Sequence, residues 1–184
     1  SVITKEELEE VIRFAESRGL HLLIDETYRD LSFGAPLPLA ANLSPNVISV
    51  SSMSKAYGVP GIRLGWVVAN EPLIDSVRAV REQITICNAS LSEKIAFSIM
   101  LKKEAFLEKV REKVMDNYQV VEHWMRSRND LEWIPAHGGV TIFPRLSEDV
   151  PSDDLCRLLI EKYRTFVIPG YCFNMPRFFR LGFG

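Results

Sequence analysis

Residues 51–66, SSMSKAYGVPGIRLGW, form a segment of mostly small residues that carries one lysine, Lys55. Apolar segments rich in β-branched residues flank it: residues 46–50 precede it and residues 66–69 follow it. Short Val/Ile-rich runs bounded by Pro, Asn and Gly fit the length and composition of buried strands better than those of a helix. The sequence therefore predicts two strands joined by a loop that presents an amine.

This loop resembles the cofactor-lysine segment of the class I/II aminotransferases, which are pyridoxal-phosphate enzymes of the aspartate aminotransferase fold (fold type I). The family pattern is Ser-x-Ser-Lys-x-x-Gly-x-x-Gly-x-Arg-x-Gly. Seven positions of this chain match it, namely Ser52, Ser54, Lys55, Gly58, Gly61, Arg63 and Gly65. The resemblance implies pyridoxal 5′-phosphate as the cofactor, joined to Lys55 as a Schiff base. An isolated Ser-Lys pair would instead indicate a solvated surface lysine.

The residue types in the loop agree with this chemistry. An amine that must condense with an aldehyde is best presented on a short loop whose small neighbours let a planar cofactor approach. The hydroxyls of Ser52 and Ser54 and the guanidinium of Arg63 are suitable donors to a doubly charged phosphate. If the strand after the loop runs antiparallel to the strand before it, all these groups share one edge of the sheet.

A second motif, residues 25–28 (Asp-Glu-Thr-Tyr), follows a short apolar strand expected at residues 21–26. It resembles the family's Asp-x-x-Tyr element, which implies that Asp25 holds the pyridine nitrogen of the cofactor and that Tyr28 donates to its 3′ oxygen. Because successive strand residues face opposite sides, only one of Asp25 and Glu26 should reach a given ligand. Ligands of open α/β sheets lie beyond the carboxyl ends of strands, where Asp25 and Lys55 are both expected.

The last residues, 177–184, resemble the family strand whose arginine clamps the α-carboxylate of the substrate. Arg180 matches that arginine. A guanidinium can make two parallel charge-assisted hydrogen bonds to a carboxylate, which the point charge of lysine cannot. Arg177 should face the other way, as a surface residue.

Helix signals and strand signals organise the rest of the chain. Thr4 and Glu7 form a capping box that predicts a helix ending near Arg18, with Gly19 as its stop. Further helices are expected from residue 71 to about 84, from 90 to 128 with a break near 102–104, and after Ser152. Strands are expected at 131–134 and 140–144, a strand followed by a turn at 166–170, and a surface connection at 31–45.

These elements predict an α/β fold in two parts. Residues 1–90 are expected to form part of the large PLP-binding sheet domain, and residues 91–184 an interdomain helix and a smaller α/β C-terminal domain. Family members carry a long region before the equivalent of residue 1, so the resemblance implies that this chain is the C-terminal part of a larger protein.

Composition narrows the classes of protein. The 184 residues are 47% hydrophobic and 25% charged, with a net charge of −2, which indicates a globular domain without a nucleic-acid-binding surface. No apolar run reaches the roughly 20 residues of a membrane helix, and no secretory signal begins the chain, so we expect no membrane contact and a cytoplasmic protein. Three widely spaced cysteines favour buried thiols, and no metal site is expected.

The function implied by the resemblance is an aminotransferase that acts on an amino acid and a 2-oxo acid, as a homodimer. Other enzymes of this fold would use the same lysine and aspartate. They include a β-lyase, a decarboxylating enzyme, and a cyclase or oxidase of an amino-acid derivative. Residues 169–173 resemble a segment of one such enzyme, capreomycidine synthase. A non-catalytic alternative is an aminotransferase-like sensor domain of a transcription regulator. An α/β domain without a cofactor is the remaining alternative.

Overall fold

Residues 2–184 are described by the computed structural model, in which the chain forms two units, residues 2–110 and residues 111–184. The mixed α/β architecture agrees with the predicted fold class. The two units divide inside a helix, at residues 110 and 111. The predicted domain boundary after residue 90 stays a prediction.

The first helix, α1 (Lys5–Ser17), begins with the predicted capping box. The backbone N–H of Thr4 donates to Glu7 Oε2 over 2.8 Å, and the backbone N–H of Glu7 donates to Thr4 Oγ1 over 3.2 Å. Gly19 ends the helix with a φ of 62°, in the left-handed region that favours glycine. Both ends of α1 were therefore readable from the sequence.

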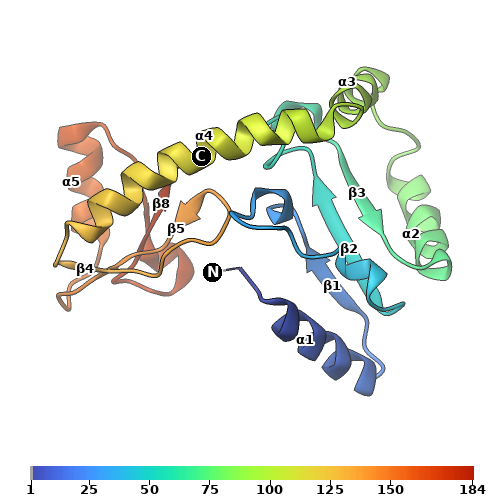
Figure 1. The fold of residues 1–184 in the computed structure, drawn as a ribbon, viewed down its shortest axis with the longest axis horizontal. Helices are drawn as coiled ribbons and strands as arrows, with labels where there is room; N and C mark the ends of the chain where they lie inside the picture. Colours follow the sequence, from blue (N-terminus) through green and yellow to red (C-terminus); the bar gives the residue numbers. More distant parts are fainter. Residues whose placement is uncertain (1) are drawn as a thin grey trace. The chain divides into compact units, whose positions relative to one another are not determined.

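The sheet of the first unit contains β1 (Leu22–Asp25), β2 (Val47–Ser52) and β3 (Gly65–Val68), in the order β1-β2-β3 (Figure 1). Strands β1 and β2 are parallel, and β2 and β3 are antiparallel. Helix α1 packs its apolar side against this sheet in a core of four buried residues, Leu8, Ile12, Ala40 and Val47.

The segment between β1 and β2 lies largely at the surface, as expected for residues 31–45. It contains two 3₁₀ turns, η1 (Arg29–Leu31) and η2 (Ala40–Asn42), and Ala40 is fully buried. Two side chains hold η2 in place, because the backbone N–H of Ala40 donates to Glu26 Oε1 over 2.8 Å and that of Ala41 donates to Ser49 Oγ over 2.9 Å. These bonds fix Ala40 in a buried position within a connection that is otherwise mostly exposed or half-buried.

Three helices follow the sheet: α2 (Glu71–Ile84), α3 (Ser90–Met100) and α4 (Lys103–Arg126). Asn70 caps α2 by accepting from the backbone N–H of Leu73 over 3.0 Å. The predicted break in the long helical tract lies between α3 and α4. Helix α4 continues without interruption from the first unit into the second (Figure 1). Within the described chain no helix combines the length and the apolar character that crossing a membrane requires.

The second unit contains short strands and one further helix. Strand β4 (Leu131–Glu132) pairs with β6 (Arg145–Leu146), and β8 (Phe179–Gly182) lies between β5 (Thr141–Ile142) and β7 (Ile168–Pro169). Helix α5 (Asp153–Tyr163) and the turn η4 (Gly170–Phe173) complete the unit. The apolar core of this unit includes the buried residues Cys156, Val167 and Phe179. Strand β6 had no sequence signal of its own.

Ser152 precedes α5 as predicted, but its side chain does not cap the helix. The fully buried hydroxyl donates to the carbonyl of Phe178 over 2.6 Å and accepts from the backbone N–H of Gly170 over 3.2 Å. Ser152 therefore joins the start of α5 to the segment before β8. The cap prediction was right about the position and wrong about the hydrogen bond.

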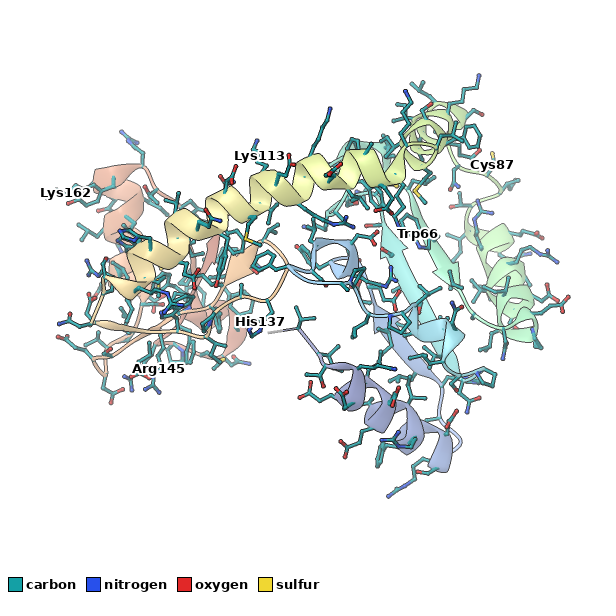
Figure 2. All side chains as sticks on the ribbon, viewed as in Figure 1. Trp66, Cys87, Lys113, His137, Arg145 and Lys162 are labelled. Atoms are coloured by element: carbon teal, nitrogen blue, oxygen red, sulfur yellow. The ribbon has the colours of Figure 1, made fainter. Side chains whose placement is uncertain are left out.

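The expectation of buried cysteines holds for one of the three. Cys156 is buried in the second unit, and this burial raises the pKa of its thiol. Cys87 and Cys172 are exposed: Cys87 lies on the connection between α2 and α3 (Figure 2), and Cys172 lies in η4. Both exposed thiols are on turns, where no neighbouring element covers them.

Candidate functional site

The sheet of the first unit brings the predicted cofactor residues to one edge. Asp25 is the last residue of β1, and Ser52 is the last residue of the parallel strand β2. Gly65 begins the antiparallel strand β3 and pairs with Ser52. The carboxyl ends of β1 and β2 therefore meet the start of β3, as the predicted antiparallel arrangement requires. The loops that carry Tyr28, Lys55 and Arg63 all leave from this edge.

The lysine loop, residues 53–64, is held by backbone hydrogen bonds and by buried neighbours. The N–H of Met53 donates to the carbonyl of Leu64 over 3.0 Å, and the N–H of Gly58 donates to the carbonyl of Lys55 over 3.0 Å. Met53, Ala56 and Tyr57 are buried, whereas Lys55 is exposed. The loop is thus anchored on both sides of Lys55 while the lysine amine itself remains accessible.

Two loop positions carry backbone constraints. A Cβ atom on Gly65 would lie 2.7 Å from the carbonyl oxygen of Ser51, so the close approach of β2 and β3 requires glycine there. Arg63 has a φ of 53°, in the left-handed region, at a cost of about 1–2 kcal/mol for a residue with a side chain. Its guanidinium Nη1 donates to the carbonyl of Pro60 over 2.8 Å. The fold thus holds an exposed arginine in a strained conformation at the sheet edge.

The two carboxylates at the end of β1 have different environments. Asp25 is exposed at the edge, and its Oδ1 accepts from the backbone N–H of Thr27 over 2.9 Å and also from the Thr27 hydroxyl. Glu26 instead accepts from the backbone of Ala40. Glu26 therefore has a structural role, and Asp25 is the carboxylate accessible to a ligand, which agrees with the predicted alternation.

The remaining predicted residues lie nearby on the same edge. Tyr28 precedes η1, with its side chain 40% exposed. Ser52 and Ser54 are half-buried, and the Ser52 hydroxyl accepts from the backbone N–H of Ser54 over 3.3 Å. Amine, hydroxyl, guanidinium and carboxylate groups thus gather around one edge. This set of donors and acceptors fits an aldehyde that carries a phosphate and a ring nitrogen.

A polar network that sequence analysis missed supports the lysine loop. The hydroxyl of Tyr57 donates to Asp30 Oδ2 over 2.9 Å, and Lys103 Nζ of α4 lies 3.3 Å from the same oxygen. The Tyr57 ring also stacks on Phe106 of α4, with centroids 6.3 Å apart, and meets Trp66 edge-on. The side chain of Asp30 is only 12% exposed. The loop is therefore tied to both η1 and α4 within the first unit.

Nothing in the sequence indicated this network, because Asp30 and Lys103 are 73 positions apart. The one partial signal was Tyr57 itself, an aromatic residue within a loop of small residues. A large side chain there must be either exposed or buried against other elements, and only the structure shows which.

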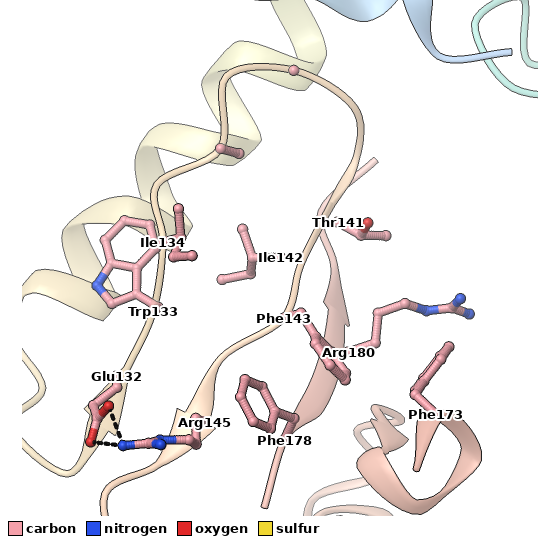
Figure 3. A pocket seen from close by; sticks show the side chains of 12 residues that line it. Glu132, Trp133, Ile134, Thr141, Ile142, Phe143, Arg145, Phe173, Phe178 and Arg180 are labelled. Atoms are coloured by element: carbon pink, nitrogen blue, oxygen red, sulfur yellow. Dashed lines mark hydrogen bonds and ion pairs between the residues drawn. The ribbon is translucent and has the colours of Figure 1, made fainter. Parts of the chain in front are cut away.

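Arg180 lies in the second unit, on β8, and is described with that unit. It lines an open pocket of about 610 Å³ together with Thr141 of β5, Phe143 directly after β5 and residues before β5 (Figure 3). The register of β5 and β8 puts the alternate residues Phe179 and Phe183 in the core and leaves Arg180 exposed. Alternation along the strand thus directs this guanidinium to the open face of the sheet.

The other arginines of this region are bonded to protein groups. Arg145 donates to both carboxylate oxygens of Glu132, over 2.7 and 2.5 Å, and this hydrogen bond lowers the pKa of Glu132 below its ordinary value. Arg177 donates to the carbonyls of Leu146 and Ser147. Arg177 is half-buried, so its expected role as a surface residue is wrong. Within residues 2–184, no carboxylate lies within ion-pair distance of Arg180.

Metal chemistry receives no support from the described residues. Across residues 2–184, no three His, Cys, Asp or Glu side chains are grouped closely enough to hold a metal ion.

Comparison with known proteins gives consistent results. A family model described as aminotransferase class I and II matches residues 1–184. Capreomycidine synthase from Streptomyces vinaceus is 31% identical over 165 residues, which are 88% of this chain and 42% of that protein. The HTH-type transcriptional regulator NorG from Staphylococcus aureus is 27% identical over 179 residues, which are 94% of this chain and 40% of the regulator.

Among solved structures, a PLP-dependent aminotransferase from Streptococcus suis superposes with a TM-score of 0.93 at 30% identity. The match covers 100% of this chain and 49% of that one. The chain therefore spans about two fifths of the length of these curated relatives and about half of the length of this structure.

Proposed function

Because this chain belongs to the class I and II aminotransferase family, we propose that the complete protein is a PLP-dependent aminotransferase that moves an amino group between an amino acid and a 2-oxo acid. The observation that carries this proposal is the sheet edge in the first unit. There an exposed lysine lies on a buried, hydrogen-bonded loop next to the strand end that carries Asp25. A solvated surface lysine would need neither the buried anchors nor the close strand approach at Gly65.

The residues at the edge would hold pyridoxal 5′-phosphate, the cofactor of this family. When bound, this cofactor withdraws electrons from the substrate α-carbon and so makes its proton removable. Asp25 would accept a hydrogen bond from the protonated ring nitrogen, and Tyr28 would donate to the 3′ oxygen. Ser52, Ser54 and Arg63 would bind the phosphate through charge-assisted hydrogen bonds.

Two residues would act on the substrate. The guanidinium of Arg180 would bind its α-carboxylate and so fix the orientation of the α-carbon. The Nζ atom of Lys55 would act as the general base that takes the proton from this carbon and as the acid that returns it. The exposed amine of Lys55 and the unpaired state of Arg180 within the described residues support these roles.

The direct test uses the complete protein with Lys55→Ala and, as a control, Lys113→Ala at an exposed position of α4. We expect Lys55→Ala to lose the visible absorption band of a lysine-bound cofactor and nearly all transamination, whereas Lys113→Ala keeps both. Borohydride reduction followed by peptide mapping should place the pyridoxyl group on Lys55. A pyridoxyl group found on another lysine would refute the assignment.

Two alternatives rest on specific relatives. The 31% identity to capreomycidine synthase favours a cyclase that acts on an amino-acid derivative, and the 27% identity to NorG favours a sensor domain of a regulator. Stoichiometric conversion of 2-oxoglutarate or pyruvate to its amino acid by the complete protein supports the aminotransferase over both. Sequence-specific DNA binding without turnover would support the regulator.

We also propose that the complete protein is a cytoplasmic homodimer. Its partners would be an amino acid and a 2-oxo acid, and it would not bind nucleic acid. The net charge of −2 supports the absence of a nucleic-acid surface. Sedimentation equilibrium of the complete protein tests the dimer, and cell fractionation tests the location.

A further inference from the structure

The pocket beside Arg180 has an aromatic wall. We use this name for Phe143, Phe173 and Phe178, which come from the position directly after β5, from η4 and from the segment before β8. The rings of Phe143 and Phe178 are stacked with centroids 5.0 Å apart, and Phe173 meets Phe143 edge-on at 5.2 Å. The Arg180 guanidinium carbon lies 5.4 Å from the centre of the Phe173 ring. Figure 3 shows Arg180 and the three rings on the same side of the pocket.

The charged side chains around the pocket differ in whether they are paired with a group of opposite charge. At the other end from Arg180, Glu132 and Arg145 are bonded to each other (Figure 3). Among the described residues that line the pocket, Arg180 is thus the cation without an acidic partner, and the one lining carboxylate is already neutralised. The pocket therefore offers a binding position for one carboxylate next to a broad apolar surface.

We propose that this pocket selects the substrate: an amino acid with a large aromatic side chain that lies on the aromatic wall while Arg180 binds its α-carboxylate. This inference rests on the proposed function, because it assigns the amino-acid substrate of that reaction. Ring-on-ring contacts and apolar burial favour such a side chain over a small one. The volume of about 610 Å³ is within the range of pockets for small ligands.

The other classes of amino acid fit less well. An acidic side chain would need a second cation, but Arg145 is bonded to Glu132. A basic side chain would need a carboxylate, but Glu132 is bonded to Arg145, and burying a charge without a partner is unfavourable. A short aliphatic side chain would leave much of the aromatic wall uncovered.

The kinetic experiment compares phenylalanine with aspartate as amino donors to the complete protein. We expect a higher kcat/KM for phenylalanine, and Phe143→Leu or Phe173→Leu should lower that value about tenfold while leaving the value for aspartate nearly unchanged. The matched control is Phe166→Leu, because Phe166 is 72% exposed in the same unit and does not line the pocket. We expect no effect from the control.

A binding experiment separates this inference from the proposed function. Isothermal titration of the complete protein with 3-phenylpropionate, which has no amine to transfer, should show tighter binding than titration with succinate. Binding of 3-phenylpropionate should weaken with Phe173→Leu and be lost with Arg180→Ala. If binding follows this pattern but no amino donor is turned over, the pocket is supported and the aminotransferase is not.

The opposite outcomes overturn the inference alone. If aspartate or lysine is the better donor, the pocket does not select aromatic side chains, whereas the aminotransferase stands. If 3-phenylpropionate binds no more tightly than propionate, or if Phe143→Leu and Phe173→Leu change neither affinity nor specificity, another part of the protein covers the aromatic wall and the inference is wrong.

Discussion

At the scale of single residues, Tyr57 is the main support of the lysine loop. It lies two positions after Lys55 and is 1% exposed, although it belongs to a loop. Its hydroxyl donates to Asp30, and its ring contacts both Trp66 and Phe106. The position of Lys55, the proposed cofactor lysine, thus depends on a neighbour that takes no part in the proposed chemistry.

Removing the Tyr57 hydroxyl should show how much its hydrogen bond contributes to stability. Tyr57→Phe keeps the ring contacts but leaves a largely buried carboxylate with one donor fewer, so we expect a loss of about 1–3 kcal/mol in the free energy of unfolding. Urea unfolding of the complete protein gives this value. Tyr163→Phe is the control, because that ring is 58% exposed on α5, and it should change the free energy by less than about 0.5 kcal/mol. Equal losses in the two variants would contradict the interpretation.

The pair of Glu132 and Arg145 predicts a pH dependence. The hydrogen bond from Arg145 lowers the pKa of Glu132 in the folded state, so the bond stabilises the fold at pH values above the unfolded pKa of about 4.3. This contribution is lost as the pH falls through that value toward the lower folded pKa. Glu132→Gln should therefore be less stable than the natural protein at pH 7, and the difference should narrow below about pH 4.

Urea unfolding of both proteins between pH 3 and 7 checks this dependence. Asp154→Asn on α5 is a suitable comparison, because its ion pair with Arg157 is long, 3.7 Å, and its side chain is 93% exposed. A stability difference for Glu132→Gln that stayed constant across this range would show that the ion pair is not its cause.

At the scale of elements, local signals predicted the helices better than the short strands. The capping box at Thr4, the Pro in the first turn of α2 and the apolar periodicity of α3 and α4 are all encoded within a few residues. Strand β6, in contrast, has only two residues and is stabilised by pairing with β4. The position of η2 likewise depends on hydrogen bonds to Glu26 and Ser49, which lie 14 and 8 positions from their partners in the sequence. Pairing between segments that are far apart in the sequence could not be predicted from the local sequence pattern.

The contact between β2 and β3 makes a prediction for Gly65. Gly65→Ala would put a Cβ atom 2.7 Å from the carbonyl oxygen of Ser51, so the strands must separate at the lysine loop. We expect a loss of about 1–3 kcal/mol in the free energy of unfolding and weaker retention of the cofactor in the complete protein. Gly34→Ala is the control, because a Cβ there meets no atom within 4 Å. Thermal unfolding and cofactor content measured after gel filtration are the readouts.

At the scale of the whole molecule, motif spacing predicted which residues of the first unit share an edge. Ser52, Lys55 and Arg63 lie on one short loop, and Asp25 ends the strand parallel to β2. The pocket of the second unit was not predictable, because its aromatic wall is assembled from three separate segments. The family motif pointed to Arg180, whereas Phe173 and Phe178 lie in segments that resemble known enzymes but received no predicted role.

Many apolar side chains remain exposed between residues 84 and 101, among them Ile84, Ile86, Leu91, Phe97 and Leu101. Exposed apolar residues that gather in one region mark an interface. We therefore expect the 184-residue chain, produced alone, to self-associate as its concentration rises. Combining Phe97→Ser with Leu101→Ser should reduce the association, whereas Lys109→Ser on α4 should not. Sedimentation velocity at several concentrations distinguishes these outcomes, and a monomer at all concentrations would count against an interface here.

Helix α4 carries buried side chains on both sides of the unit boundary: Leu107 before residue 110, and Val114, Tyr118 and Met125 after it. Helix formation is cooperative, so an uninterrupted run of hydrogen bonds is more stable than two separate short helices. If α4 lost its helical conformation in one unit, the helix that remains in the other would be shorter and therefore less stable. The stabilities of the two units are thereby coupled through a shared structural member, and heat should melt them together rather than one after the other.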